Sequence, residues 1–217
     1  MIEYYNEDCM IGMARYPDKH FDLAIVDPPY GIGIDGGIGG GVKAKKSSFV
    51  KKGWDKECPS KHYFDELLRI SKNQIIFGAN HFISNIPINS RCWIVWDKLN
   101  GKNNFADCEL AWTSFQSSVR KFAYKWQGML QGDMKNKEHK IHPTQKPVAL
   151  YKWILKNYAK PGDLILDTHV GSASSLIACY DMGFNAVGFE IDPDYYAASK
   201  KRLESFMAQI RLEEVME

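Results

Sequence analysis

Short apolar runs alternate with amphipathic segments along most of the chain. The strand candidates are mostly apolar segments at residues 2–5, 21–26, 74–77, 92–96, 163–167 and 186–190. The segments with helical spacing or helix-opening residues lie at 8–14, 61–71, 147–158, 172–181 and 193–207. Strands that alternate with helices are typical of an α/β domain on a mostly parallel sheet. Residues 107–115 are longer and more polar, which predicts an edge or antiparallel strand.

Two connections, residues 31–56 and 116–142, are longer than most loops of compact domains, and such loops usually carry function. The first is rich in Gly and Lys and is expected to be mobile. The second is irregular, basic and aromatic. The sequence predicts a single domain over residues 1–217 that carries these two long segments.

The composition fits a globular protein with a substantial core, because 45% of the 217 residues are hydrophobic. The longest apolar runs stay far below the ~20 residues that span a bilayer. The start MIEYYNEDCM has neither the basic residues nor the apolar core of a signal peptide, which predicts a cytoplasmic protein without membrane contact. The five cysteines form no C-x-x-C pair, which argues against a disulfide framework and against a zinc site.

The net charge of +2 is unevenly distributed. Six lysines lie between Val42 and Lys56 against the single acid Asp55, and residues 119–146 hold seven basic residues against two acids. Two basic segments on a nearly neutral chain favour a polyanionic partner. Solvated surface loops are the alternative, and charge alone does not separate the two.

The segment Leu164–Glu190 has the layout of a cofactor site. A predicted strand ends at Asp167, a turn of small residues 171–174 leads into a helix, and the next strand ends at Glu190. Small residues let a ligand approach the backbone, and the acid can accept hydrogen bonds from ribose hydroxyls. A tight turn beside an incidental acid is the alternative. Because the turn lacks the further glycines that suit a pyrophosphate, a phosphate-free adenosine ligand such as S-adenosylmethionine (AdoMet) is favoured.

A literal G-x-G-x-x-G pattern, GIGIDG, occupies residues 31–36 after a predicted strand. The residues that follow, GIGGGVKAKK, are poor helix formers, so no helix opens there as a dinucleotide site requires. We therefore interpret this match as accidental.

The residues DPPY, 27–30, come directly after the strand 21–26. Pro28 and Pro29 stiffen the backbone and remove two N–H donors, which leaves the Asp27 carboxylate and the Pro28 carbonyl as acceptors. Two acceptors and the flat ring of Tyr30 suit one task, which is to hold the amino group of a planar heterocycle. A proline-terminated strand with a turn tyrosine is the structural alternative.

DPPY, LDTHVGSASS, GFEID and HPTQKP together resemble the amino-group DNA methyltransferases. Their order, with DPPY first and the cofactor turn last, is similar to the circularly permuted β class of bacterial and phage enzymes. These enzymes form N6-methyladenine or N4-methylcytosine. The resemblance covers nearly the whole chain and implies a Rossmann-like, AdoMet-dependent methyltransferase fold. It implies a mostly parallel seven-stranded sheet with one antiparallel strand.

The resemblance also assigns roles to single residues. It implies catalysis by Asp27, Pro28, Pro29 and Tyr30. Asp8 matches the position that contacts the AdoMet adenine, and the HPTQKP segment lies beside the methionine end of the cofactor in the family. The implied cofactor-binding set is Asp8, Asp27, His142, Thr144, Lys146, Asp167, His169, Gly171, Ser172, Ala173, Glu190 and Ile191.

The cofactor turn departs from the family pattern D-P-F-x-G-S-G-T. Here it reads Asp167-Thr168-His169-Val170-Gly171-Ser172-Ala173-Ser174. We expect Ala173 to permit close approach through a negative φ, and His169 to stack where the family has an aromatic residue.

The resemblance implies double-stranded DNA as the partner, with a homodimer and a cognate restriction nuclease as further candidates. Residues 116–142 would then be a short target-recognition insertion. The expected DNA-binding residues are Lys43, Lys45, Lys46, Lys51, Lys52, Arg120, Lys121, Lys125 and Trp126, the last as a wedge. Candidates for base readout are Gln116, Arg120, Gln127, Gln131 and Asn136.

The predicted reaction is methyl transfer from AdoMet to the N6 amine of an adenine flipped out of duplex DNA, without a metal. N4-cytosine methylation and a catalytically impaired DNA-binding relic are the alternatives. A methyltransferase that acts on RNA or on a protein glutamine amide could hold the amine in a similar way, but the basic loops and HPTQKP favour DNA. A cytosine-C5 mechanism needs a thiolate, and no cysteine is expected beside the DPP turn. A nicotinamide-dependent dehydrogenase would leave DPPY without a role.

Overall fold

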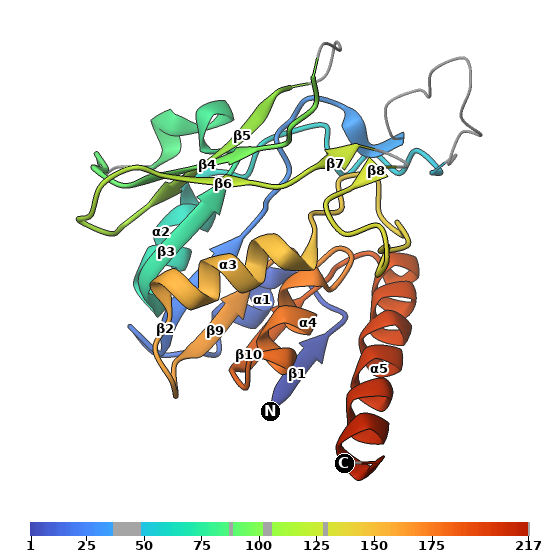
Figure 1. Cartoon of the computed structure of the whole chain (residues 1–217). Helices are drawn as coiled ribbons and strands as arrows, with labels where there is room; N and C mark the ends of the chain where they lie inside the picture. The colour runs from blue at the N-terminus through green and yellow to red at the C-terminus, as the bar shows by residue number, and fades with distance from the viewer. Residues whose placement is uncertain (37–48, 87–88, 102–105, 128–129, 217) are drawn as a thin grey trace.

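The computed structural model describes residues 1–36, 49–86, 89–101, 106–127 and 130–216, with side chains described as far as Ile210. An eight-stranded sheet runs through the molecule in the order β1-β10-β9-β2-β3-β5-β4-β6 (Figure 1). Its strands are β1 (Ile2–Tyr5), β2 (Phe21–Val26), β3 (Ser71–Phe77), β4 (Trp93–Asp97), β5 (Cys108–Thr113), β6 (Arg120–Ala123), β9 (Leu164–Asp167) and β10 (Asn185–Phe189). A separate hairpin consists of β7 (Trp126–Gln127) and β8 (Leu130–Gln131).

The predicted α/β fold with one antiparallel strand is confirmed. Strand β5 runs antiparallel to both of its neighbours, β3 and β4, and the other pairings in this sheet are parallel. The expectation of seven strands is corrected to eight, because β6 pairs with the outer side of β4. The polar and basic character of residues 120–123 concealed this strand, as is common for edge strands that face water.

Helices cover both faces of the sheet. They are α1 (Cys9–Met13), α2 (Lys61–Ile70), α3 (Val148–Tyr158), α4 (Ser174–Asp181) and α5 (Pro193–Met216), with single 3-10 turns at Ile34–Gly36, Ala79–His81 and Ile83–Asn85. The helices α3 and α4 pack on the front face in Figure 1, α1 and α2 pack behind, and α5 runs beside α4. Helix α5 extends well past the predicted end at residue 207. No helix in these ranges is long and apolar enough to cross a membrane.

Strand β2 shows why the sheet is buried on both faces. Leu23 and Ile25 contact the core beneath α3 and α4, whereas Ala24 and Val26 contact the core beneath α1 and α2. Side chains alternate between the faces of a strand, so the part of a strand that is covered on both sides is apolar. The apolar run 23–26 is therefore typical of a central strand, whereas Asp22 at the start of β2 is half-buried and pairs with Lys72. The predicted bounds 21–26 match those observed.

The first strand of the chain lies beside the last. β1 pairs in parallel with β10, with Ile2 opposite Ala186 and Tyr5 opposite Phe189. The Tyr4 hydroxyl lies 2.6 Å from the Ser199 hydroxyl on α5, which ties the N-terminal strand to the C-terminal helix. The two ends of the chain thus lie together at the β1–β10 side of the sheet.

We expect Gly12→Ala to lower the free energy of unfolding by about 1–3 kcal/mol, because overpacking would outweigh the gain in helix propensity. A Cβ at Gly12 would lie 2.4 Å from Cε1 of the fully buried Phe189 ring. Urea denaturation measures the change. Ile11→Ala, on the exposed side of the same helix, is the matched control and should change stability by less than about 0.5 kcal/mol. Equal effects of the two substitutions would contradict the packing explanation.

Candidate active site

Polar residues meet where three parallel strands end. Strands β2, β9 and β10 run in the same direction, so their carboxyl ends carry Asp27, Asp167 and Glu190 to one edge of the sheet. From β9 the chain continues to β10 on one side, and from β2 it continues to β3 on the other. Such a topological switch point is where open α/β sheets place their ligands.

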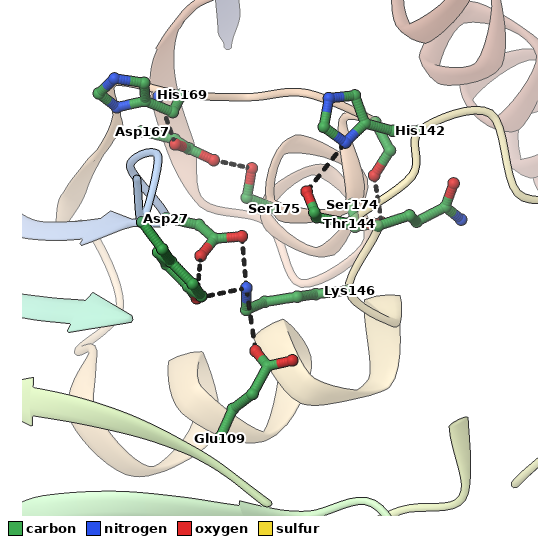
Figure 2. Close-up of polar contacts among 12 residues, drawn as sticks. Asp27, Glu109, His142, Thr144, Lys146, Asp167, His169, Ser174 and Ser175 are labelled. Atoms are coloured by element: carbon green, nitrogen blue, oxygen red, sulfur yellow. Dashed lines mark hydrogen bonds and ion pairs between the residues drawn. The ribbon is translucent and has the colours of Figure 1, made fainter. Parts of the chain in front are cut away.

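A cleft lies at this edge and collects most of the predicted site. The predicted residues that line it are Asp27, Pro29, His142, Thr144, Lys146, His169, Gly171, Ser172, Glu190 and Ile191. The structure adds residues that we did not predict, namely Trp54, Gln145, Tyr151, Val170, Asp192 and Tyr195. The DPPY turn, the cofactor turn and HPTQKP therefore form one site, as Figure 2 shows for its polar members.

Asp27 accepts hydrogen bonds from two side chains. The Tyr30 hydroxyl donates to Asp27 Oδ1 at 2.6 Å, and the Lys146 ammonium donates to Asp27 Oδ2 (Figure 2). Lys146 also lies 3.2 Å from Tyr30 Oη. Burial raises the pKa of Asp27 and would lower that of Lys146, but the facing carboxylates outweigh burial for the lysine and raise its pKa. The result is a buried ion pair at the centre of the cleft.

Lys146 has a second carboxylate within reach. Its Nζ lies 3.2 Å from Glu109 Oε2, and Glu109 also pairs with Lys98 from the end of β4. Burial would raise the pKa of Glu109, but the two ammonium groups outweigh it and lower that pKa to about 2. Glu109 was not among the predicted site residues. The available signal was a polar residue within the strand predicted at 107–115.

The ring of Tyr30 does not face the cleft, where we expected it to help hold a planar heterocycle. Its ring lies against Gly78 and stacks on His81, with 5.0 Å between the ring centroids and 15° between the planes. A Cβ at Gly78 would lie 2.0 Å from the Tyr30 ring, so this approach requires glycine. Tyr30 is not part of the cleft lining, and it contacts the site through its hydroxyl, which donates to Asp27 and accepts from Lys146.

The cofactor turn is held by two carboxylates. Asp167 accepts hydrogen bonds from the His169 N–H at 3.0 Å and from the Ser175 hydroxyl. Glu190 accepts the Gly171 N–H and the Asp192 N–H, both at 2.9 Å. Burial raises the pKa of Asp167 to about 7 and also raises that of Glu190. Both carboxylates therefore fix the backbone that forms the cleft wall.

The expected negative φ at Ala173 is wrong. Ala173 has φ 62° and ψ 20°, in the left-handed region that alanine rarely adopts. The family has glycine at the position of Ala173, and this chain keeps the conformation that favours glycine. Gly171 has a φ of 55° as well. Ala173 is fully buried beside the turn and does not line the cleft.

The two histidines of the site are buried and have depressed pKa values. Burial lowers the pKa of His142 to about 3 and that of His169 to about 4, so both rings are neutral at pH 7. His142 Nδ1 lies 3.1 Å from the Thr144 hydroxyl, and its ring meets Tyr195 edge to face. The His169 ring lines the cleft and meets Tyr63 edge to face, whereas Asp8 serves as N-cap of α1.

Asp55 fixes the turn that follows DPPY. Its carboxylate, which is 1% exposed, accepts hydrogen bonds from the N–H groups of Tyr30, Gly31 and Ile34 at 2.7–2.9 Å. Its carbonyl accepts the Gly33 N–H at 2.9 Å. The neighbouring Trp54 lines the cleft. The end of the loop predicted at 31–56 is therefore part of the site.

The five lysines of this loop that were predicted to bind DNA divide into three groups. Lys43, Lys45 and Lys46 lie outside the described residues. Lys51 is exposed. Lys52 forms ion pairs with Asp192 and Asp194, and its ammonium lies 4.8 Å from the centre of the Tyr195 ring. In this structure Lys52 joins the loop to the start of α5 and is not a free cation.

The residues of segment 116–142 that were predicted to bind DNA differ in how exposed their side chains are. Arg120 and Lys121 are exposed on the edge strand β6, and Lys125 follows that strand, half-buried. The Trp126 ring is 7% exposed and its Nε1 donates to the Gln145 carbonyl at 2.7 Å, so it would have to leave the core to act as a wedge. Gln131, a candidate for base readout, is buried and bonded to Glu138.

A cysteine does lie beside the DPP turn, contrary to our expectation. Cys58 Sγ donates to the Tyr30 carbonyl at 3.0 Å, and Cys58 lines a second cavity together with Pro29. Burial raises the pKa of Cys58, so it remains a thiol. The argument against a thiolate nucleophile therefore rests on protonation of this cysteine and not on its distance.

Comparisons with known proteins agree with this geometry. Residues 113–201 match the N6/N4 methyltransferase family model, described as DNA methylase. The chain is 25% identical to Type II methyltransferase M.HpaI of Haemophilus parainfluenzae, over 89% of this chain and 71% of that protein. It is 27% identical to Type II methyltransferase M2.MboI of Moraxella bovis, over 91% of this chain and 86% of that protein.

The fold is also similar to solved structures. The crystal structure of the M1.HpyAVI-SAM complex superimposes with a TM-score of 0.63 at 20% identity. The match covers 94% of this chain and 99% of that one.

We expect Asp167→Asn to change how stability depends on pH. The folded pKa of Asp167 is raised from the ordinary 3.8 to about 7, so the folded state retains a proton that the unfolded chain releases. The resulting stabilisation is complete below about pH 4 and is lost as pH rises to about 7. An amide does not ionise, so the stability of the variant relative to wild type should rise across this range by up to about 1.4 kcal/mol per pH unit. Urea denaturation at several pH values measures this, and parallel profiles would contradict it.

Proposed function

We propose that the chain is an amino-group DNA methyltransferase, which transfers a methyl group from AdoMet to the N6 amine of adenine in duplex DNA. One observation carries the proposal: the Asp27 carboxylate lines the same cleft as Gly171 and Glu190. An acceptor for an amine and a turn for an adenosine ligand thus open into a common space.

The residues of the cleft suit AdoMet. Asp27, Glu190 and Asp192 bring three carboxylates to its wall. Asp27 is paired with Lys146 and Asp192 with Lys52, so among the described residues Glu190 is the carboxylate of the wall without an ion pair. Its negative charge favours a cationic sulfonium and disfavours a pyrophosphate. Glu190 stands where ribose hydroxyls would be accepted, and Ile191 beside it is 62% exposed, which offers an apolar surface to an adenine ring.

The proposed mechanism uses the acceptors of the DPPY turn. The Asp27 carboxylate and the Pro28 carbonyl would each accept one hydrogen of the target amine, which localises the nitrogen lone pair. AdoMet supplies an electrophilic methyl group when bound, and transfer in line requires no metal and no covalent intermediate. Burial raises the pKa of Asp27, which suits this carboxylate to receive the proton that the amine loses.

The target base must leave the duplex to reach this cleft. Arg120 on the edge strand β6 and Lys51 are exposed cations that suit phosphate contacts. Lys121 is exposed as well, but its ammonium lies 3.3 Å from Asp97 Oδ2, so a phosphate would have to replace that carboxylate. Phosphate contacts of this kind would orient the duplex without reading its sequence. We assign base readout to the segment 116–142 and to the loop 31–56.

Adenine is proposed over cytosine because Asp27 holds the first position of DPPY, where the family favours Asp for adenine and Ser for cytosine. Two curated relatives carry the name of type II enzymes, which supports a role in bacterial restriction–modification, in the cytoplasm. N4-cytosine methylation uses the same acceptors and remains the alternative product.

The direct test is methylation of mixed-sequence genomic DNA with labelled AdoMet, followed by nucleoside analysis. We expect label in N6-methyladenine and its loss, by at least about a hundredfold, in Asp27→Ala, because this variant lacks the acceptor that aligns the amine. Circular dichroism checks that this variant is folded, and calorimetry measures AdoMet binding by the wild type.

Three other outcomes would each contradict one part of the proposal, namely the target base, the role of Asp27 or the activity itself. Label in N4-methylcytosine would replace the target base and keep the mechanism. Full activity of Asp27→Ala would refute the role of Asp27. Absence of both label and AdoMet binding would favour a DNA-binding relic with a disabled cofactor turn.

Asp55→Ala should impair methyl transfer through the DPPY turn. The substitution leaves three backbone N–H groups without their acceptor, and each buried unsatisfied donor costs about 1–3 kcal/mol. Asp35→Ala is the matched control, since Asp35 is an equally buried carboxylate near the same loop that accepts the Gly53 N–H instead. At temperatures where both variants are folded by circular dichroism, kcat should fall at least about tenfold in Asp55→Ala relative to Asp35→Ala. Equal kcat values would show that the turn does not need this carboxylate.

A further inference from the structure

The Lys146 ammonium occupies the position that the target amine would need. It donates to Asp27 Oδ2, while the Tyr30 hydroxyl donates to Oδ1. Lys146 is only 4% exposed. A nitrogen donor from the protein is thus already bound to the carboxylate that we assign to the amine of the base. For the amine to bind Asp27 in the same way, Lys146 must move.

Glu109 offers a place for Lys146 to move to. Its Oε2 is buried and accepts no well-aligned hydrogen bond from the described residues, although it lies 3.2 Å from Lys146 Nζ. At 3.2 Å the ammonium already pairs with this oxygen electrostatically, so a small shift of Lys146 is enough to form a well-aligned hydrogen bond there. Transfer of the ammonium from Asp27 Oδ2 to this oxygen would satisfy it.

The charges permit this movement within a buried site. Asp27, Glu109, Lys98 and Lys146 form a group of two carboxylates and two ammonium ions. Lys146 remains between the carboxylates in either position, so no charge becomes isolated when it shifts. The ring of Phe77 lies 4.8 Å from the Lys146 ammonium and keeps its other side apolar.

We propose that Glu109 is a positioning residue of the methyltransferase, which takes over the Lys146 ammonium when the target amine binds Asp27. The inference rests on the proposed function. It makes Lys146 an internal substitute for the substrate amine in the free enzyme. Entry of the base would exchange one nitrogen donor on Asp27 for another and would leave the buried charge balanced.

The first test is Glu109→Gln, assayed by methyl incorporation from labelled AdoMet into genomic DNA. A neutral amide holds an ammonium more weakly than a carboxylate does, so Lys146 should stay on Asp27 and compete with the base. We expect kcat/KM for DNA to fall at least about tenfold, the range of a lost charged hydrogen bond. AdoMet affinity by calorimetry should be retained. Asp107→Asn, which removes an exposed carboxylate two residues earlier, should keep wild-type kinetics.

The second test separates this role from a purely structural one. Lys146→Met alone leaves two buried carboxylates facing each other without their shared ammonium. The double variant Lys146→Met/Glu109→Gln removes both the competing ammonium and the second carboxylate, and the Tyr30 hydroxyl still donates to Asp27. We expect the double variant to exceed each single variant in kcat/KM by about tenfold, within the coupling energies of contacting residues.

The outcomes distinguish this proposal from the proposed function. If wild type fails to methylate DNA, both are refuted. If wild type is active and Glu109→Gln matches it, the role of Glu109 alone is refuted. If the double variant is no more active than Glu109→Gln, the two residues stabilise the site without exchanging an ammonium, which also overturns the inference.

Discussion

The buried ammonium of Lys146 is the constraint on which the site depends. It lies between carboxylates that come from the end of β2 and from β5, and its own segment precedes α3. Removal of one partner of a buried ion pair costs several kcal/mol, because an uncompensated charge remains in a poorly solvated place. The two strands and the HPTQKP segment therefore have to assemble together. The sheet therefore reaches its native arrangement only when Asp27 also reaches its place beside Lys146.

The parts of this arrangement that follow from local rules were predictable from the sequence. The predicted strand 21–26 matches the bounds of β2, because the part of a strand that is covered on both faces, here residues 23–26, has to be apolar. The small residues after Asp167 and the acid at 190 indicated a ligand site, because the carboxyl ends of neighbouring parallel strands must meet. The link between Lys146 and the cofactor came from the family resemblance and from no local pattern.

The parts that depend on long-range contacts were not predictable. Asp55 fixes the backbone of residues 30–34 from within a basic, glycine-rich loop, where an isolated acid gives no signal of its target. Cys58 reaches the carbonyl of Tyr30 across 28 positions. Glu109 had the appearance of a polar residue on an edge strand, whereas β5 is interior to the sheet. In each case the partner is determined by how the chain folds back, and periodicity does not report this.

The two prolines of DPPY explain why Asp27 can exchange its hydrogen-bond donors whereas Asp167 and Glu190 cannot. Asp167 and Glu190 accept backbone N–H groups, which are fixed by the turn and cannot leave. Pro28 and Pro29 have no N–H to donate, so in the described part of the chain the donors to Asp27 are side chains, the Tyr30 hydroxyl and the Lys146 ammonium. Side chains rotate at little cost, whereas a backbone donor moves only with its strand. The same cleft therefore combines rigid carboxylates that shape a cofactor turn with one exchangeable carboxylate, and an incoming amine requires an acceptor of the second kind.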